Sequence, residues 1–116
     1  MKYECADAYI QMGQKYPKMI DEFEDITHDM VNLFCMKQSD YGPKNIGMGD
    51  VVVDTDKKVK RSLTGLSVRM NDKIQRMLNL MLNNKEPLNE SIEDTLIDIA
   101  NYAVMALIVQ RKLWGK

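Results

Sequence analysis

The acidic residues near the C-terminus are spaced so that they could hold a divalent cation. Glu90, Asp94 and Asp98 follow one another at intervals of four residues, which places them along one side of a helix. Like charges at this spacing destabilise an isolated helix by about 0.2–0.5 kcal/mol per pair. No Lys or Arg occurs between residues 86 and 110, so a compensating positive charge must come from outside the helix. Mg²⁺, which takes carboxylates, water and phosphate oxygens as ligands, is one source of that charge.

The basic residues of the preceding segment are the second source. Residues 57–76 hold seven Lys and Arg against one acidic residue. Arg69, Lys73 and Arg76 lie together on the flank of an apolar helical stripe. They could form interhelical salt bridges with the acidic residues of the last helix, or bind phosphate groups. Mixed use is a third alternative, in which one arginine positions an acid while another binds a phosphate.

A second acidic group occurs in an earlier helical segment. Glu22, Asp25 and Asp29 share one side of this segment. Two acidic helices that face each other would form a carboxylate cage of the kind that helical bundles use for metals. A solvated acidic face near a helix N-terminus is the alternative, because the helix dipole favours acids there. The predicted metal site consists of Asp29, Glu90, Asp94 and Asp98.

The elements that must position these residues are helices. Apolar residues recur at spacings of three and four in residues 18–38, 66–82 and 89–113. Between residues 39 and 65 this period is lost and glycines appear. We therefore predict an all-α fold, a small helical bundle with one long glycine-containing loop between the first and second long helices. A chain of 116 residues has room for one core, so we expect a single domain over residues 1–116.

The last helix is apolar over most of its circumference. Its main apolar stripe centres near Leu96 and Ala103, and the acidic residues and Asn101 lie on the opposite side. Further along that opposite side follow Met105 and Ile108. A helix that is apolar on every face is buried on every face. We therefore expect the acidic stripe in a cleft or a subunit interface. We also expect a homo-oligomer in which a partner subunit covers Met105, Ile108 and Val109.

Composition excludes several classes of protein. Lys and Arg number 16 and Asp and Glu 17, a net charge of −1, which argues against direct nucleic-acid binding. No apolar run approaches the roughly 20 residues that span a bilayer, and the first nine residues contain no apolar secretory signal. Two Cys and one His are too few for a zinc site. We expect a cytoplasmic protein that does not bind membranes.

Three ordered motifs carry a resemblance to a known family. Residues 37–42 read K-x-x-D-Y-G and are followed by Asn45. Residues 65–76 read G-x-x-x-R-x-x-D-K-x-x-R, and residues 89–102 read N-E-x-x-x-D-T-L-x-D-x-A-N-Y. Three motifs in order are far more specific than any one of them. Over roughly residues 20–110 the chain resembles the nucleotide modification associated domain family (first type) of phages and bacteria.

The chain is also similar, more distantly, to the MazG-like and dimeric dUTPase all-α nucleotide pyrophosphatases. Those enzymes bind Mg²⁺ with carboxylates on two facing helices and cleave a nucleotide between its α and β phosphates. The resemblance implies a nucleotide-handling protein. The first function that it implies is that of a Mg²⁺-dependent pyrophosphatase acting on a (deoxy)nucleotide. In this function Glu90, Asp94 and Asp98 are catalytic and bind the metal with Asp29. The residues expected to bind the nucleotide and its phosphates are Lys37, Asp40, Tyr41, Asn45, Arg69, Lys73, Arg76 and Asn101.

An alternative function involves binding without turnover. The protein would then sequester a nucleotide, or a cyclic or ADP-ribose-type defence signal. The acidic residues would accept hydrogen bonds from ribose hydroxyls or amino groups, and the basic residues would bind phosphates without a metal. The two functions differ in whether the ligand is recovered intact.

Overall fold

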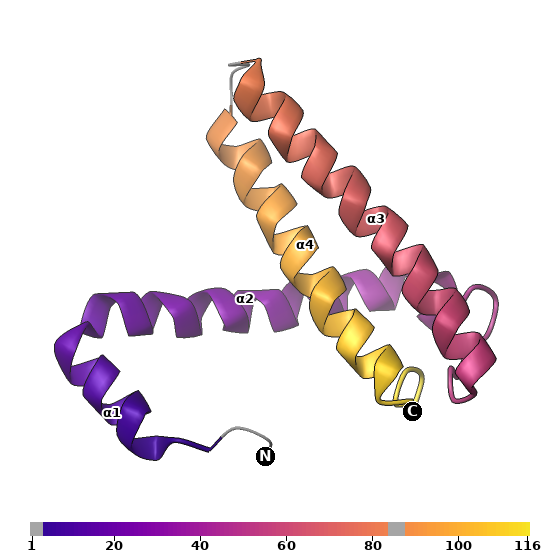
Figure 1. Cartoon of the computed structure of the whole chain (residues 1–116), viewed down its shortest axis with the longest axis horizontal. Coiled ribbons are helices and arrows are strands. Elements are labelled where there is room, and N and C mark those ends of the chain that lie inside the picture. The colour runs from indigo at the N-terminus through magenta and orange to yellow at the C-terminus, as the bar shows by residue number, and fades with distance from the viewer. Residues whose placement is uncertain (1–3, 84–87) are drawn as a thin grey trace. The chain divides into compact units, whose positions relative to one another are not determined.

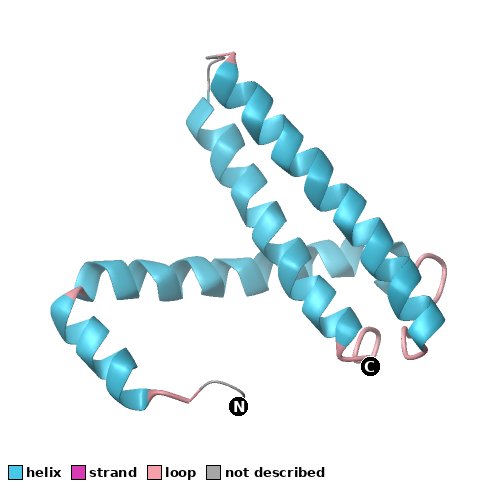
Figure 2. Ribbon diagram, in the orientation of Figure 1, coloured by secondary structure: helices cyan, strands magenta, loops and turns pink. Residues whose placement is uncertain are grey.

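The described part of the chain is mainly helical. The computed structural model describes residues 4–83 and 88–116, without the side chains of residues 88–91. No helix in these two ranges carries an apolar stretch long enough to cross a lipid bilayer. The all-α fold and the long glycine-containing loop after the first long helix are as predicted (Figure 2). The elements are α1 (Ala6–Lys15), α2 (Pro17–Tyr41), the 3-10 helix η1 (Pro43–Asn45), α3 (Asp56–Leu82) and α4 (Leu88–Gln110) (Figure 1).

The chain divides into two compact units, Met1–Leu33 and Phe34–Lys116. The first unit holds α1 and most of α2, which begins at Pro17, where a missing backbone N–H costs nothing. The Tyr9 hydroxyl of α1 donates a hydrogen bond to the Glu24 carboxylate of α2, and this bond raises the pKa of Tyr9. Neither helix buries a residue completely. The prediction of a single domain stays a prediction.

The second unit contains the core. Helices α3 and α4 pack along each other as an antiparallel pair (Figure 1), as expected for helices joined by a short connection. The last two turns of α2, from Phe34 onward, belong to the same unit. Its buried apolar side chains come from the loop, α3, α4 and the C-terminal segment, and they are Ile46, Val53, Leu66, Met105, Val109 and Trp114.

The C-terminal segment closes the core against the loop and α2. The backbone N–H of Val53 donates to the carbonyl of Trp114 at 3.1 Å. The indole Nε1–H of Trp114 donates to the carbonyl of Pro43 at 3.0 Å. The Trp114 ring meets the Phe34 ring edge-on, with centroids 6.0 Å apart, a geometry that aromatic pairs prefer. These contacts hold η1 beside the end of α2.

Helix α3 begins ten residues earlier than predicted. It starts at Asp56, after the N-cap residue Thr55, whose side chain accepts a hydrogen bond from the Lys58 backbone N–H at 3.3 Å. Residues 56–65 are mostly polar and basic, and only a few side chains such as Val59 and Ser62 turn inward. The apolar period over these residues was therefore too sparse to indicate a helix.

The prediction for the buried face of α4 was wrong. Leu96 and Leu107 of the expected stripe are each 48 % exposed, and Ala103 is exposed as well. The opposite, partly polar side faces α3 and α2, because the Asp98 carboxylate on that side forms ion pairs with lysines of both helices. Among its described side chains, α4 buries Thr95, Asn101, Met105 and Val109. Met105 and Val109 are thus covered within the chain, and the expectation that a partner subunit covers them was wrong.

Candidate functional site

A polar cavity lies in the second unit where α2, η1, α3 and α4 meet. Its volume is about 320 Å³, at the small end of the range for ligand pockets. We call it the polar cavity because charged, amide and phenol groups form most of its wall. The lining residues are Lys37, Gln38, Tyr41, Asn45, Ile46, Arg69, Lys73, Asp98, Tyr102 and Met105.

The Asp98 carboxylate links three helices at this cavity. Lys37 Nζ donates to its Oδ1 at 2.8 Å, and Lys73 Nζ lies 3.0 Å from its Oδ2. The Asp98 side chain is only 16 % exposed. Burial alone would raise the pKa of Asp98, but the hydrogen bonds and charges of the two lysines hold this pKa below its usual value. The same hydrogen bond to Asp98 raises the pKa of Lys37. Asp98 and Lys37 are therefore both charged at neutral pH.

Arg69 anchors the backbone at the end of η1. Its Nη2 donates to the Asn45 carbonyl at 3.2 Å and to Asn45 Oδ1 at 3.3 Å. A guanidinium has five N–H donors in a fixed fork, so these bonds leave donors for a ligand. The sequence left open whether Arg69 and Lys73 form salt bridges or bind phosphate. In the structure Lys73 pairs with Asp98 and Arg69 holds Asn45.

The lining carries more positive than negative charge. Lys37, Arg69 and Lys73 contribute three cations, and Asp98 contributes one carboxylate. Among the described lining residues this leaves a net charge of +2. Tyr41, 67 % exposed, places an aromatic ring at the edge of the cavity. The arrangement can bind an anion next to a planar group.

Six of the predicted site residues line this cavity, and the others lie elsewhere. Asp40, Arg76 and Asp94 are exposed and are not part of the lining, whereas Asn101 is buried at 7 % exposure. Asp29 is an exposed residue of the first unit. Glu90 belongs to α4, but its side chain lies outside the described residues. The six residues in the lining are Lys37, Tyr41, Asn45, Arg69, Lys73 and Asp98.

The predicted metal site is not visible in the described part of the chain. Within it, no group of three or more His, Cys, Asp or Glu side chains comes close enough to hold a metal ion. Both carboxylate oxygens of Asp98 already face lysine ammonium groups, which occupy the directions a cation would need. The described donors therefore do not fit Mg²⁺. Coordination that includes Glu90 stays a prediction.

Sequence reasoning missed four lining residues. Gln38 stands between Lys37 and Tyr41 in the first motif, where the pattern treats it as variable. Tyr102 lies four residues after Asp98 and so shares its side of α4. Tyr102 could therefore have been predicted by following the side of the helix that carries Asp98 for one more turn. The helical pattern placed Met105 on the same side of the helix as the acidic residues, but it did not assign Met105 to the site. Ile46 carried no signal beyond being apolar.

Comparisons with known proteins return one family. No curated protein and no solved structure matches the chain, and the more distant similarity to MazG-like and dimeric dUTPase pyrophosphatases stays a prediction. The sequence profile of nucleotide modification associated domain 1 matches residues 37–109. This range begins at Lys37 on the wall of the polar cavity and includes all ten lining residues. Because the match covers more than half of the chain, the protein belongs to the nucleotide modification associated domain 1 family.

Proposed function

We propose that the polar cavity binds a nucleotide through its phosphate groups, without hydrolysing it. The observation that carries this proposal is the excess of positive charge in the lining, which holds the three cations Lys37, Arg69 and Lys73 and one carboxylate. Charge-assisted hydrogen bonds from ammonium and guanidinium groups to phosphate are among the strongest that proteins make. Membership of a nucleotide-associated family supports the same class of ligand.

Asp98 acts as a positioning residue in this proposal. Its two oxygens hold Lys37 and Lys73 at fixed places on the cavity wall, so the lysines lose little side-chain freedom when a phosphate arrives. The lysines have further N–H donors for the phosphate oxygens. The wall is therefore organised for an anion before the anion binds.

Hydrolysis is the second candidate function. Asp94 and Asp98 lie one turn apart on α4, a spacing that favours shared ligation of a cation. In this case the Asp94→Asn variant should lose turnover and keep its fold. Because the described donors do not fit a metal, we derive no catalytic step for this chain.

One chromatographic assay separates the two functions. The purified protein is incubated with nucleoside triphosphates, modified deoxynucleotides and cyclic nucleotides, with Mg²⁺ and with EDTA. We expect one nucleotide to be depleted from the free pool in both conditions and to be recovered intact after the protein is heated. A cleaved product that requires Mg²⁺ would show hydrolysis instead, and no depletion of any nucleotide would contradict both functions.

A matched pair of arginine variants locates the binding site. Arg69 lines the polar cavity, and Arg76 is exposed on the same helix outside it. Arg69→Gln removes a hydrogen bond to a charged group and should weaken nucleotide binding by at least about tenfold. Arg76→Gln changes the net charge equally and should alter the dissociation constant by less than twofold. Equal losses in the two variants would place the phosphates elsewhere.

A further inference from the structure

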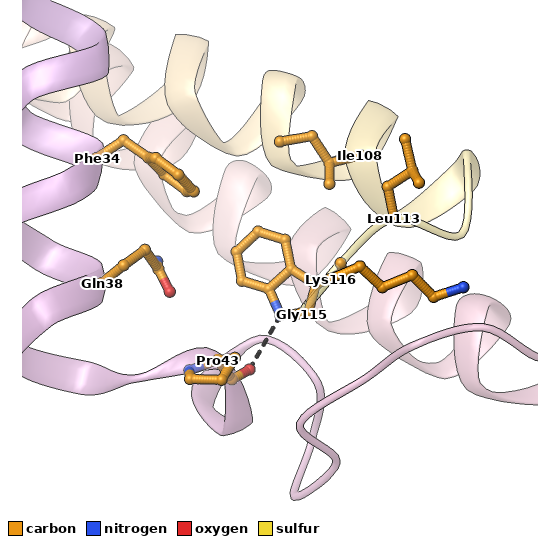
Figure 3. A pocket seen from close by; sticks show the side chains of 8 residues that line it. Phe34, Gln38, Pro43, Ile108, Leu113, Gly115 and Lys116 are labelled. Atoms are coloured by element: carbon orange, nitrogen blue, oxygen red, sulfur yellow. Dashed lines mark hydrogen bonds between the residues drawn. The ribbon is translucent and has the colours of Figure 1, made fainter.

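A second cavity lies on the other side of Gln38. It has a volume of about 300 Å³ and lies between the end of α2, the start of η1 and the segment that follows α4 (Figure 3). We call it the aromatic cavity after its two rings. Figure 3 shows Phe34 and Gln38 projecting from α2, with Ile108 and Leu113 across from them. The lining residues are Phe34, Gln38, Pro43, Ile108, Leu113, Trp114, Gly115 and Lys116.

The chemistry of the aromatic cavity differs from that of the polar cavity. Phe34 and Trp114 supply rings, and Ile108 and Leu113 supply aliphatic surface. Lys116 is the one charged side chain among the described lining residues. A mostly apolar pocket with a few polar groups is typical of sites for planar organic ligands. The Trp114 ring is held in place without a ligand, because its Nε1–H donates a hydrogen bond to the Pro43 carbonyl.

Gln38 connects the two cavities. Its side chain lines both of them, so groups bound in either cavity would lie against Gln38. Within the described residues, the Gln38 amide group makes no hydrogen bond. The amide offers two N–H donors and one carbonyl acceptor. It is the group through which a ligand in the aromatic cavity would be recognised by hydrogen bonding.

We propose that the aromatic cavity binds the base of the nucleotide whose phosphates occupy the polar cavity, and that the Gln38 amide hydrogen-bonds the edge of that base. This proposal rests on the proposed function. The rings of Phe34 and Trp114 bury the base, and the amide selects among bases. A side-chain amide pairs in a bidentate manner with the amino group and neighbouring ring nitrogen of adenine, so adenine nucleotides should bind most tightly.

The test uses Trp114 as a local reporter, because it is the only Trp of the chain. The protein is titrated with ATP and, separately, with inorganic tripolyphosphate, which carries phosphates but no base. Binding is followed by calorimetry and by tryptophan fluorescence. We expect ATP to change the Trp114 emission, and tripolyphosphate to bind and leave this emission unchanged.

Variants of Gln38 then distinguish binding of the base from binding of the phosphates. Gln38→Leu keeps the size of the side chain and removes its amide group. The variant should weaken ATP binding by about tenfold and change the affinity for tripolyphosphate by less than twofold. If Gln38→Leu fails to fold, Gln38→Glu is a second substitution of equal size. This variant should also no longer discriminate among bases. The control Gln75→Leu changes an exposed Gln on α3 and should change neither affinity.

Three results would each contradict a different part of the proposal. If ATP binds and leaves Trp114 emission unchanged, the base does not enter the aromatic cavity. If Gln38→Leu weakens ATP and tripolyphosphate equally, Gln38 serves the phosphates and not the base. If neither ATP nor tripolyphosphate binds, the proposed function itself is wrong.

Discussion

The two ion pairs of Asp98 predict a measurable loss of stability when its charge is removed. Asp98→Asn leaves the Lys37 and Lys73 ammonium groups facing a neutral amide. Exposed ion pairs contribute about 0.2–1 kcal/mol, and loss of one partner from a fully buried pair costs about 3–5 kcal/mol. The Asp98 side chain is 16 % exposed, and those of Lys37 and Lys73 are 40 % and 28 % exposed. This intermediate burial places the expected loss at about 2 kcal/mol.

The pH dependence of this loss follows from the direction of the pKa shift. The pKa of Asp98 is lower in the folded protein than its usual value. The stabilisation is therefore fully present above the unfolded pKa of about 3.9, and it disappears as the pH falls through the lower folded pKa. The pKa of Lys37 is raised, so its contribution is lost only at alkaline pH, above its unfolded value of about 10.4. The difference between the wild type and Asp98→Asn should be constant from pH 5 to pH 9.

Urea unfolding monitored by Trp114 fluorescence measures the effect. Trp114 is 3 % exposed and lies in the core of the same unit, so its emission reports on unfolding there. At pH 7 the midpoint of Asp98→Asn should fall by about 1 M urea with an unchanged slope, and the difference should shrink below pH 4. Asp94→Asn is the matched control, because Asp94 is exposed one turn earlier on α4 and should cost less than about 0.5 kcal/mol. Equal losses for the two variants, or a loss for Asp98→Asn that does not shrink as the pH falls below 4, would refute the reasoning.

Two further predictions concern the C-terminal segment and the outer face of α4. Gly115 has φ of +83°, and a Cβ there would lie 1.9 Å from the Val51 carbonyl oxygen, so Gly115→Ala should lower the free energy of unfolding by more than about 2 kcal/mol. A loss below 0.5 kcal/mol in urea unfolding would contradict this. We also predict that a second copy of the chain covers the exposed apolar side chains Leu96 and Leu107, so that the protein forms a homo-oligomer. Sedimentation should give a mass above 13.4 kDa at micromolar concentration for the wild type and a smaller mass for Leu107→Lys, and a strictly monomeric wild type would contradict the prediction.

Local sequence determined the helices, the loop and the family. Spacings of three and four apolar residues predicted the three long helices, because a helix must present one continuous apolar side to its neighbours. Gly42, Gly47 and Gly49 marked the loop after α2, and Gly42 and Gly49 adopt positive φ. The three motifs indicated the family, and the match of the family profile to residues 37–109 confirmed it. The six lining residues of the polar cavity that the sequence predicted for the site all belong to these motifs.

Tertiary structure decided which side of each helix is used. Helix α4 has apolar residues on most of its circumference, so its periodicity did not determine its rotation. That rotation brings Asp98 to Lys37 on α2 and Lys73 on α3, and it leaves Leu96 exposed. The partners of Asp98 are 61 and 25 residues away in the sequence, a separation that no local pattern encodes.

The two cavities likewise depend on contacts between distant segments. In the sequence, Gln38 is a variable position within a motif. In the structure it lines both cavities, one together with Phe34 and Trp114 and the other together with Arg69 and Asp98. The sequence by itself determined which residue types were available for binding an anion and on which helices they stand. Which of them meet was decided by the packing of α4 against α3 and by the Lys37 side chain that reaches Asp98 from the end of α2. Burial of a charged carboxylate is tolerated there because lysines of both helices reach it.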